Sequence, residues 1–155
     1  MRRLAEPAVR RVLHLYWRQS RGLTLGVRGL VIDPRSRIFL VRHTYVTGWH
    51  LPGGGVEPGE TAVEALGREL SEEGNIALTD VPELFGIYYN AKVGNRDHVA
   101  LYVVRDFEQS AERLADREIA AAAFFPLDEL PNDTTAGTRA RIAEVLMGAP
   151  LSARW

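Results

Sequence analysis

Residues Gly54 to Ile76 read GGVEPGETAVEALGRELSEEGNI, and this stretch decides the fold and indicates the chemistry. It begins as a glycine-rich loop and continues from Thr61 as a short predicted helix. Thr61 is a good N-cap residue, and Glu64 follows three residues later, which is the spacing of a capping box. The sequence therefore predicts a loop that leads into a capped helix over residues 61–73.

Three glutamates share one face of this predicted helix. At about 100° per residue, Glu73 lies roughly 40° to one side of Glu69, and Glu72 lies roughly 60° to the other. Carboxylates at this spacing repel one another, so we expect a compensating charge nearby. Divalent cations that prefer oxygen ligands are the obvious source of that charge. Arg68 precedes Glu72 by four residues and is expected to form a salt bridge with it.

The loop before the helix is expected to bring bare backbone close to these carboxylates. It runs from Pro52 to Gly59 and contains three consecutive glycines. Glycine permits unusual dihedral angles, so a backbone carbonyl of this loop can join the glutamates as an oxygen ligand. A neighbouring stripe of the helix, formed by Val63, Leu66 and Leu70, is apolar and is predicted to face the core.

The composition is that of one ordinary globular domain. The chain has 155 residues, of which 46% are hydrophobic and 25% are charged, and this length can bury one good core. The net charge of -1 provides no basic field that would attract nucleic acid or an anionic membrane. The lack of cysteine excludes disulfides and thiolate zinc sites, and it fits a reducing, cytoplasmic compartment. No run approaches the roughly 20 apolar residues that span a bilayer.

We divide the chain into an N-terminal helical extension, residues 1–21, and one domain, residues 22–150. From Glu6 to Gln19, apolar residues recur at helical spacing and arginines occupy the other side. We interpret this segment as an amphipathic helix that packs against the domain or against the second copy in a homodimer. A helix that rests on a membrane surface is the alternative.

The remaining sequence predicts strands with one further helix. Strands are expected over residues 23–32, 37–43, 84–90, 98–107 and 119–126. Residues 33–36 read as a turn that pairs the first two strands as a hairpin. Residues 135–147 read as a closing helix, with Ile142, Val145 and Leu146 facing inward. The prediction is an α/β fold in which helices cover both faces of a mixed sheet.

The stretch quoted first resembles the box of the Nudix (MutT-like) hydrolase family. That box is Gly, five of any residue, Glu, seven of any residue, and then Arg-Glu-hydrophobic-any-Glu-Glu-any-Gly-hydrophobic. The matching positions here are Gly54, Glu60, Arg68, Glu69, Leu70, Glu72, Glu73 and Ile76. Asn75 stands where the family has its last glycine, but asparagine tolerates left-handed geometry, so the helix is still expected to end there. Residues 49–55 and 116–131 also resemble the family, which implies a Nudix-type α/β/α sandwich.

The resemblance implies a metal-dependent hydrolase. Its substrate would be a nucleoside diphosphate linked to another moiety, which is a nucleotide, a sugar or a further phosphate. Mg²⁺ or Mn²⁺ would be held by the Gly53 carbonyl, Glu69, Glu72 and Glu73, with Arg68 bracing the carboxylates. MutT-like members carry a further acidic residue six positions before an aromatic residue, and Glu118 stands six before Phe124. Glu118 is therefore carried over as a metal ligand or base, and Glu69, Glu72 and Glu118 all remain candidates for the general base.

Several side chains are candidates for contact with a small-molecule substrate. Phosphate contacts are assigned to Arg28 and Arg42, with His43, His50 and His98 as further candidates. Stacking on a nucleobase is assigned to Trp49 and Tyr89, with Tyr45 and Tyr88 as further candidates. No Gly-x-Ser-x-Gly elbow and no phosphate loop ending in Gly-Lys-Ser/Thr is present.

The sequence does not select the substrate, because the family markers of ADP-ribose, dinucleoside polyphosphate and NADH hydrolases are absent downstream of the box. Two rival functions remain. A non-catalytic Nudix-fold ligand-binding or regulatory domain is expected to lack box glutamates. An enzyme that processes RNA 5′ ends is expected to carry a basic groove, so we predict no stable nucleic-acid partner.

Overall fold

The computed structural model describes Tyr16 and residues 22–155. The elements are β1 (Thr24–Val31), β2 (Ile38–His43), α2 (Ala62–Gly74), β3 (Ile76–Leu78), β4 (Glu83–Tyr89), β5 (Asp97–Val104), β6 (Phe107–Gln109), β7 (Ile119–Phe125), the short 3₁₀ helix η1 (Leu127–Glu129) and α3 (Ala136–Leu146). The predicted extension over residues 1–21 and its helix lie outside the described residues, apart from Tyr16. None of the helices in the described part is long and apolar enough to cross a membrane.

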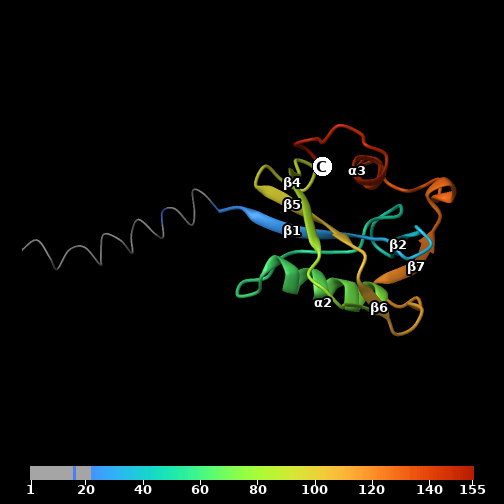
Figure 1. Cartoon of the computed structure of the whole chain (residues 1–155). Coiled ribbons are helices and arrows are strands. Elements are labelled where there is room, and N and C mark those ends of the chain that lie inside the picture. Colours follow the sequence, from blue (N-terminus) through green and yellow to red (C-terminus); the bar gives the residue numbers. More distant parts are fainter. Residues whose placement is uncertain (1–15, 17–21) are drawn as a thin grey trace, which may run out of the picture.

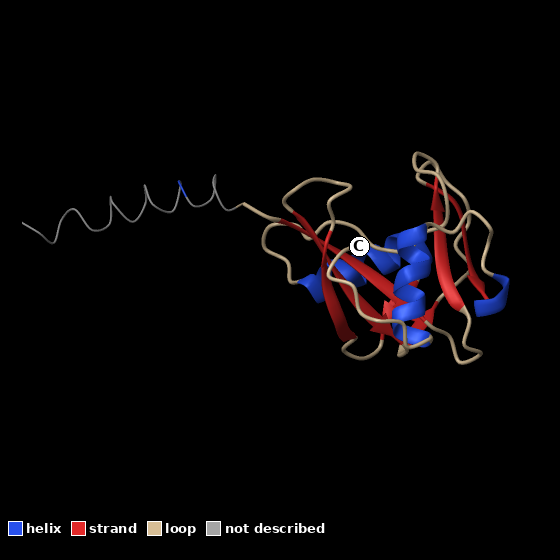
Figure 2. Ribbon diagram, turned by 90° about the horizontal axis from the view of Figure 1, so that it is seen from above, coloured by secondary structure: helices blue, strands red, loops and turns tan. Residues whose placement is uncertain are grey.

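Within residues 22–155 the strands form three sheets between two helices. In the largest sheet, β5 lies between β1, which is parallel to it, and β4, which is antiparallel to it. The other two sheets are the antiparallel pairs β2–β7 and β3–β6. Helix α2 lies on one side of the strands and α3 on the other (Figure 1). Seen from above, the strands gather in two groups (Figure 2). The predicted mixed sheet with helices on both faces is confirmed.

The predicted hairpin between the first two strands is wrong. The turn itself forms, with the Ser36 N–H donating to the Asp33 carbonyl at 2.9 Å, and a single bridge joins Ile32 to Ile38. Beyond that bridge the strands separate, because β1 pairs along all eight of its residues with β5, whereas β2 pairs with β7. The turn reverses the chain, but the longer ladders with distant strands decide the pairing. The three-residue strands β3 and β6 are too short to show a period in the sequence.

Two apolar clusters, one for each helix, fix the layers. The first contains Leu66 and Leu70 of α2, both fully buried, together with Phe39 of β2. The second contains Ile142 of α3 with Tyr88 of β4. Burying one such large side chain stabilises the fold by about 1.5–3 kcal/mol. Because Leu66 and Leu70 face the strands as predicted, the glutamate face of α2 turns toward the glycine loop.

The C-terminal tail packs against the second cluster. The Trp155 ring contacts the Tyr88 ring edge-on with centroids 5.7 Å apart. The backbone N–H of Trp155 donates to the Tyr89 carbonyl at 3.0 Å. Gly137 of α3 leaves space for this ring, because a Cβ there would lie 2.7 Å from Trp155 Nε1. Residues beyond 150, where we predicted that the domain ends, therefore pack against the domain.

Candidate functional site

Helix α2 begins and ends as the sequence predicts. The Thr61 hydroxyl accepts a hydrogen bond from the Glu64 N–H at 3.2 Å, and the Glu64 carboxylate accepts one from the Thr61 N–H at 2.7 Å. This confirms the capping box. At the other end, Asn75 adopts left-handed geometry with φ 53° and ψ 34°, in place of the family glycine. Fixed ends set the rotation of the helix and so the direction in which its glutamates point.

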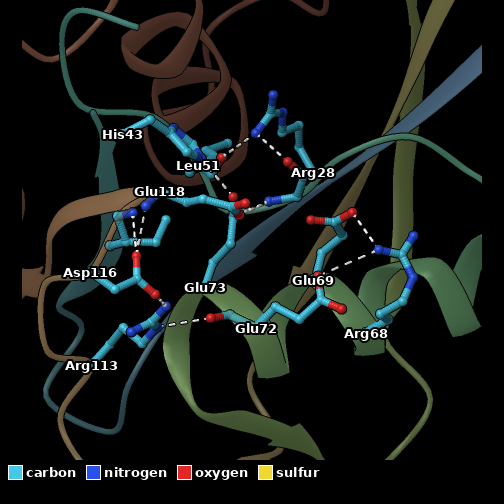
Figure 3. Close-up of polar contacts among 12 residues, drawn as sticks. Arg28, His43, Leu51, Arg68, Glu69, Glu72, Glu73, Arg113, Asp116 and Glu118 are labelled. Carbon is cyan, nitrogen blue, oxygen red and sulfur yellow. Dashed lines mark hydrogen bonds and ion pairs between the residues drawn. The ribbon is translucent and has the colours of Figure 1, made fainter. Parts of the chain in front are cut away.

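The glycine loop lies directly against two of these glutamates (Figure 3). A Cβ on Gly54 would lie 2.3 Å from Glu69 Oε1, and a Cβ on Gly53 would lie 2.1 Å from the Val27 carbonyl oxygen. Gly53 also has φ +138°, so both positions require glycine. The Gly53 N–H donates to Glu73 Oε2 at 2.8 Å. The predicted close approach of loop backbone and carboxylates is therefore present.

Glu73 is buried and both of its oxygens have protein partners. Its exposed fraction is 8%, Oε2 accepts from Gly53, and Oε1 lies 2.6 Å from His43 Nε2. His43, a further candidate for phosphate contact, lies against this carboxylate in the structure. The sequence contained a signal for this contact, because strand alternation puts His43 on the same face as Phe39 and Val41, which pack toward α2.

Arg68 forms the predicted salt bridge with Glu72, but its shortest contacts are with two other carboxylates. Its guanidinium lies 2.7 Å from Glu69 and 2.9 Å from Glu60, but 3.6 Å from Glu72. It also donates to the Gly55 carbonyl at 3.1 Å. The hydrogen bonds to Glu60 and then Glu69 raise the pKa of Arg68. Arg68 therefore joins the loop to the helix, whereas the predicted salt bridge to Glu72 is its most distant contact.

The cluster carries more negative than positive charge. Burial raises the pKa of Glu69; the hydrogen bond from Arg68 opposes this shift, and repulsion by Glu73 and Glu72 adds to it. The Glu72 side chain is 61% exposed and faces solvent. Arg28 also attracts Glu73 and Glu69. The four carboxylates of Glu60, Glu69, Glu72 and Glu73 thus outnumber these two arginines, an imbalance that a bound cation would relieve.

The residues fit a divalent metal ion by the chemistry of their donor atoms, since carboxylates and a backbone carbonyl are its preferred ligands. They are not arranged as a formed metal centre, because no three acidic or histidine side chains of the described residues lie together at ligand spacing. The Gly53 carbonyl, which we predicted as a ligand, accepts a hydrogen bond from Arg28 at 2.6 Å. Glu73 likewise has both oxygens engaged. A cation bound here would have to share or replace these protein contacts.

Glu118 approaches the same cluster from the other side. It immediately precedes β7, and Figure 3 shows its side chain extending toward Glu73. Asp116 fixes the backbone at this point by accepting a hydrogen bond from the Glu118 N–H at 2.8 Å. The structure therefore points Glu118 toward Glu73, and its role as a metal ligand or base stays a prediction.

Arg113, which the sequence did not single out, ties this loop to α2. It pairs with Asp116, and its Nε donates to the Glu72 carbonyl at 2.8 Å. The hydrogen bond from Arg113 is the main reason why the pKa of Asp116 is lowered. Arg113 and Asp116 therefore position the strand that presents Glu118. No local sequence pattern identifies this contact, because the two ends of it are 41 residues apart.

The sequence profile of the NUDIX domain matches residues 22–146. The chain belongs to the Nudix family. The matched range contains the box, both apolar clusters and Glu118. A crystal structure of a MutT NUDIX hydrolase from Burkholderia pseudomallei superimposes with a TM-score of 0.68 at 27% identity, covering 79% of this chain and 97% of that one.

Curated Nudix relatives match shorter stretches. A putative 8-oxo-dGTP diphosphatase of Bacillus subtilis is 38% identical over 78 residues, which cover 49% of this chain and 50% of the relative. An RNA pyrophosphohydrolase of Legionella pneumophila is 38% identical over 65 residues, which cover 42% of this chain and 37% of the relative. The chain thus spans half or less of the length of these relatives. Their names differ in substrate, so the similarity does not select one.

The two predicted phosphate-binding arginines of this Nudix chain lie on different sides of it. Arg28 is near the box, where it donates to the carbonyls of Leu51 at 2.9 Å and Gly53 at 2.6 Å, and burial lowers its pKa. Arg42 is exposed and lies over the Trp49 ring, 5.4 Å from its centroid. Because neighbouring residues of a strand point to opposite faces, Arg42 points away from the box glutamates.

Most of the predicted stacking residues have partners inside the protein. Trp49 is 8% exposed and Tyr88 is fully buried, which contradicts stacking by either ring on a ligand. Tyr89 is half-buried, with His98 at 5.6 Å and the Arg154 guanidinium at 5.2 Å. In these strands, packing on the core takes precedence over ligand contact.

Proposed function

We propose that this protein hydrolyses a diphosphate linkage in a nucleoside diphosphate joined to another moiety. The observation that supports it best is the packing of Glu69 and Glu73 against the Gly53–Gly54 backbone, with the exposed Glu72 beside them. Membership of the Nudix family supports the same reaction. The surplus of carboxylates argues against a purely structural role for this face of α2.

The proposed ligands of Mg²⁺ or Mn²⁺ are Glu69, Glu72, Glu73, Glu118 and the Gly53 carbonyl. When bound, such an ion neutralises diphosphate charge and makes a water molecule more acidic. Arg68 keeps Glu69 in place through its contact at 2.7 Å.

The general base is proposed to be one of the exposed carboxylates. Glu72 and Glu118 are exposed, whereas Glu69 is braced by Arg68 and both oxygens of Glu73 are engaged. A base must be able to approach the water that attacks phosphorus, and an exposed side chain has that freedom. Glu69 stays a candidate, because burial raises its pKa.

The test is phosphate release from a panel of nucleoside triphosphates, nucleotide sugars and dinucleotides with Mg²⁺. Each compound is assayed with and without pyrophosphatase or phosphatase coupling, which shows the bond that breaks. We expect turnover of at least one compound and its loss on chelation of the metal. Turnover restricted to an added 5′-triphosphorylated RNA would replace the small-molecule proposal. If the folded protein binds Mg²⁺ but releases phosphate from none of the compounds, the non-catalytic alternative is favoured.

Glu72→Gln should lower kcat on the active compound at least about 100-fold. The fold should survive, because the Glu72 side chain is 61% exposed. Glu108→Gln makes the same change at an exposed position of β6 and should leave kcat unchanged. Near-normal turnover by Glu72→Gln at saturating Mg²⁺ would contradict the proposed metal site.

We also infer a cytoplasmic protein that forms a homodimer. Sedimentation of the full chain measures this directly. A monomer at all concentrations would contradict the proposed dimer.

A further inference from the structure

A pocket of about 630 Å³ opens on the other side of the glycine loop from the glutamates. Gly54 and Gly55 form part of its wall, and Gly54 also touches Glu69. This volume is in the range that holds a small organic ligand. A substrate whose diphosphate lies over the α2 glutamates would therefore extend past this loop into the pocket.

The floor of the pocket comes from two parallel strands. Thr24, Gly26 and Arg28 alternate along β1, and Asp97 and Val99 lie opposite Thr24 and Gly26 on β5. Residues two apart on a strand share a face, so these five positions line one surface. Gly26 leaves the middle of the floor without a side chain. The pocket thus has a cationic end at Arg28 and an anionic end at Asp97, separated by about 13 Å along the strand.

At the anionic end of the pocket, the Asp97 carboxylate is held in place by hydrogen bonds from two neighbouring side chains. Asp97 is only 9% exposed, its Oδ1 accepts from the Thr24 hydroxyl at 2.7 Å, and its Oδ2 accepts from the Asn90 amide at 2.9 Å. The Arg28 cation at the other end of the pocket attracts this carboxylate.

A buried carboxylate of this kind has acceptor capacity to spare. A carboxylate offers about four lone-pair positions, and Thr24 and Asn90 occupy two of those on Asp97. Burying an ionised group is costly unless its hydrogen bonds are satisfied. Asp97 is one of the residues that line the pocket, so we expect ligand donors to reach the remaining positions. Arg28, by contrast, already donates to two backbone carbonyls.

We propose that Asp97, held by Thr24 and Asn90, determines specificity by accepting two hydrogen bonds from neighbouring N–H or O–H donors of the substrate. This inference rests on the proposed function for the position of the diphosphate. The chemistry fits a nucleoside that presents paired donors, and it rejects a moiety with only acceptors or a second anionic group. Two parts of a nucleoside carry such a pair, namely the N1–H and 2-amino edge of guanine and the vicinal hydroxyls of ribose.

The experiment measures binding of nucleoside 5′-monophosphates to the metal-free protein by calorimetry, so that it does not depend on hydrolysis. The guanosine compound is compared with the inosine compound, which lacks the 2-amino group, and with the 2′,3′-dideoxyguanosine compound, which lacks the hydroxyls. One of the two analogues should bind about 10-fold more weakly, since hydrogen bonds to a charged group are the stronger kind. In Asp97→Asn that difference should vanish. Asp106→Asn, the same change at an exposed site outside the pocket, should keep it.

The outcomes separate this inference from the proposed function. Equal affinity of wild-type protein for all three compounds, or no binding, overturns the role of Asp97 even if the hydrolysis panel is positive. A difference that persists in folded Asp97→Asn overturns it as well. If wild-type protein binds selectively and Asp97→Asn does not, the inference is supported, even when no compound of the hydrolysis panel is turned over. In that case only the proposed hydrolytic function is contradicted. If Asp97→Asn does not fold, the wild-type comparison still decides.

Discussion

Glu73 at the end of α2 and Glu144 in α3 are both 8% exposed, and each has both carboxylate oxygens hydrogen-bonded. Their surroundings differ in charge. Glu144 lies 2.6 Å from Arg141 and also accepts from the Tyr88 hydroxyl at 2.8 Å. Glu73 has a histidine and a backbone amide, and the charged groups beside it on α2 include two more carboxylates.

The difference separates a structural cluster from a site. At α3 the full cation of Arg141 compensates the carboxylate, and its guanidinium also lies 4.1 Å from the Tyr88 ring centroid. The protein thus compensates the charge of this cluster without a ligand, although Arg141 Nε is buried with no hydrogen-bond partner among the residues that the structure describes. At α2, Arg68 braces Glu69 and Glu60, and Arg28 lies close enough to attract Glu73. The carboxylates there still outnumber the two arginines, so negative charge is left over. Burial alone does not distinguish the two clusters, but the balance of charge does.

Arg141→Met should break the α3 cluster and give the largest effect. Removing one partner of a buried ion pair leaves the other charge unpaired, which destabilises a protein by about 3–5 kcal/mol. Urea unfolding measures the loss, with Arg139→Met as a matched exposed position on the same helix that should lose about 1 kcal/mol or less. A loss for Arg141→Met as small as that of the control would contradict internal compensation.

Glu69→Gln should show the opposite behaviour. The amide keeps the shape and still accepts from Arg68, while one of three repelling charges disappears. We expect kcat to fall at least about 100-fold, with the free energy of unfolding changed by less than about 1 kcal/mol. Phosphate release and urea unfolding of the same preparation test both parts. Destabilisation as large as that of Arg141→Met would mean that the α2 glutamates are structural.

Arg113→Ala should loosen the loop that presents Glu118. Its contacts with Asp116 and the Glu72 carbonyl position this loop, so kcat/KM should fall about 10-fold, as for other groups that orient ligands. Glu118→Gln should also lower activity, and the double variant should be hardly worse than the more impaired single one. Strictly additive effects would show that Arg113 acts elsewhere. Arg105→Ala, at an exposed position, is the control.

Asp33→Asn should give the smallest effect. The Asp33 carboxylate forms an ion pair with Arg37, four residues later in the same turn. Burial raises the pKa of Asp33, but hydrogen bonds from the backbone and side chain of Arg37 outweigh it, so the pKa is lowered overall. The stabilisation is therefore present above the ordinary pKa of aspartate and is lost as the pH falls through the lowered value. The variant should lose about 1 kcal/mol at neutral pH. Its unfolding free energy should also depend less on pH below about 4, and identical pH profiles would contradict this assignment.

Local interactions explain what the sequence alone could predict. The bounds of α2 follow from Thr61, Glu64 and Asn75, whose contacts span only a few residues. The inward stripe of Leu66 and Leu70 follows from helical periodicity. The glutamates of the Nudix box are likewise recognised from their spacing in the sequence. These features determined the family, the layered fold and the helix face on which the chemistry was expected.

Contacts between distant segments decided the rest. Strand pairing depended on which ladder forms more hydrogen bonds and buries more apolar surface. Strand β1 therefore pairs with β5 and not with β2, which follows it in the chain. Arg68 pairs with Glu72 as helical spacing predicts, but the path of the loop places Glu60 closer to it, at 2.9 Å against 3.6 Å.

The order of residues alone therefore predicts which side chains carry the chemistry. The tertiary structure was needed to show which carboxylates are buried and which distant groups they meet. His43 reaches Glu73 from 30 residues away, and Tyr88 reaches Glu144 from 56 residues away, because folding brings separate strands and helices together.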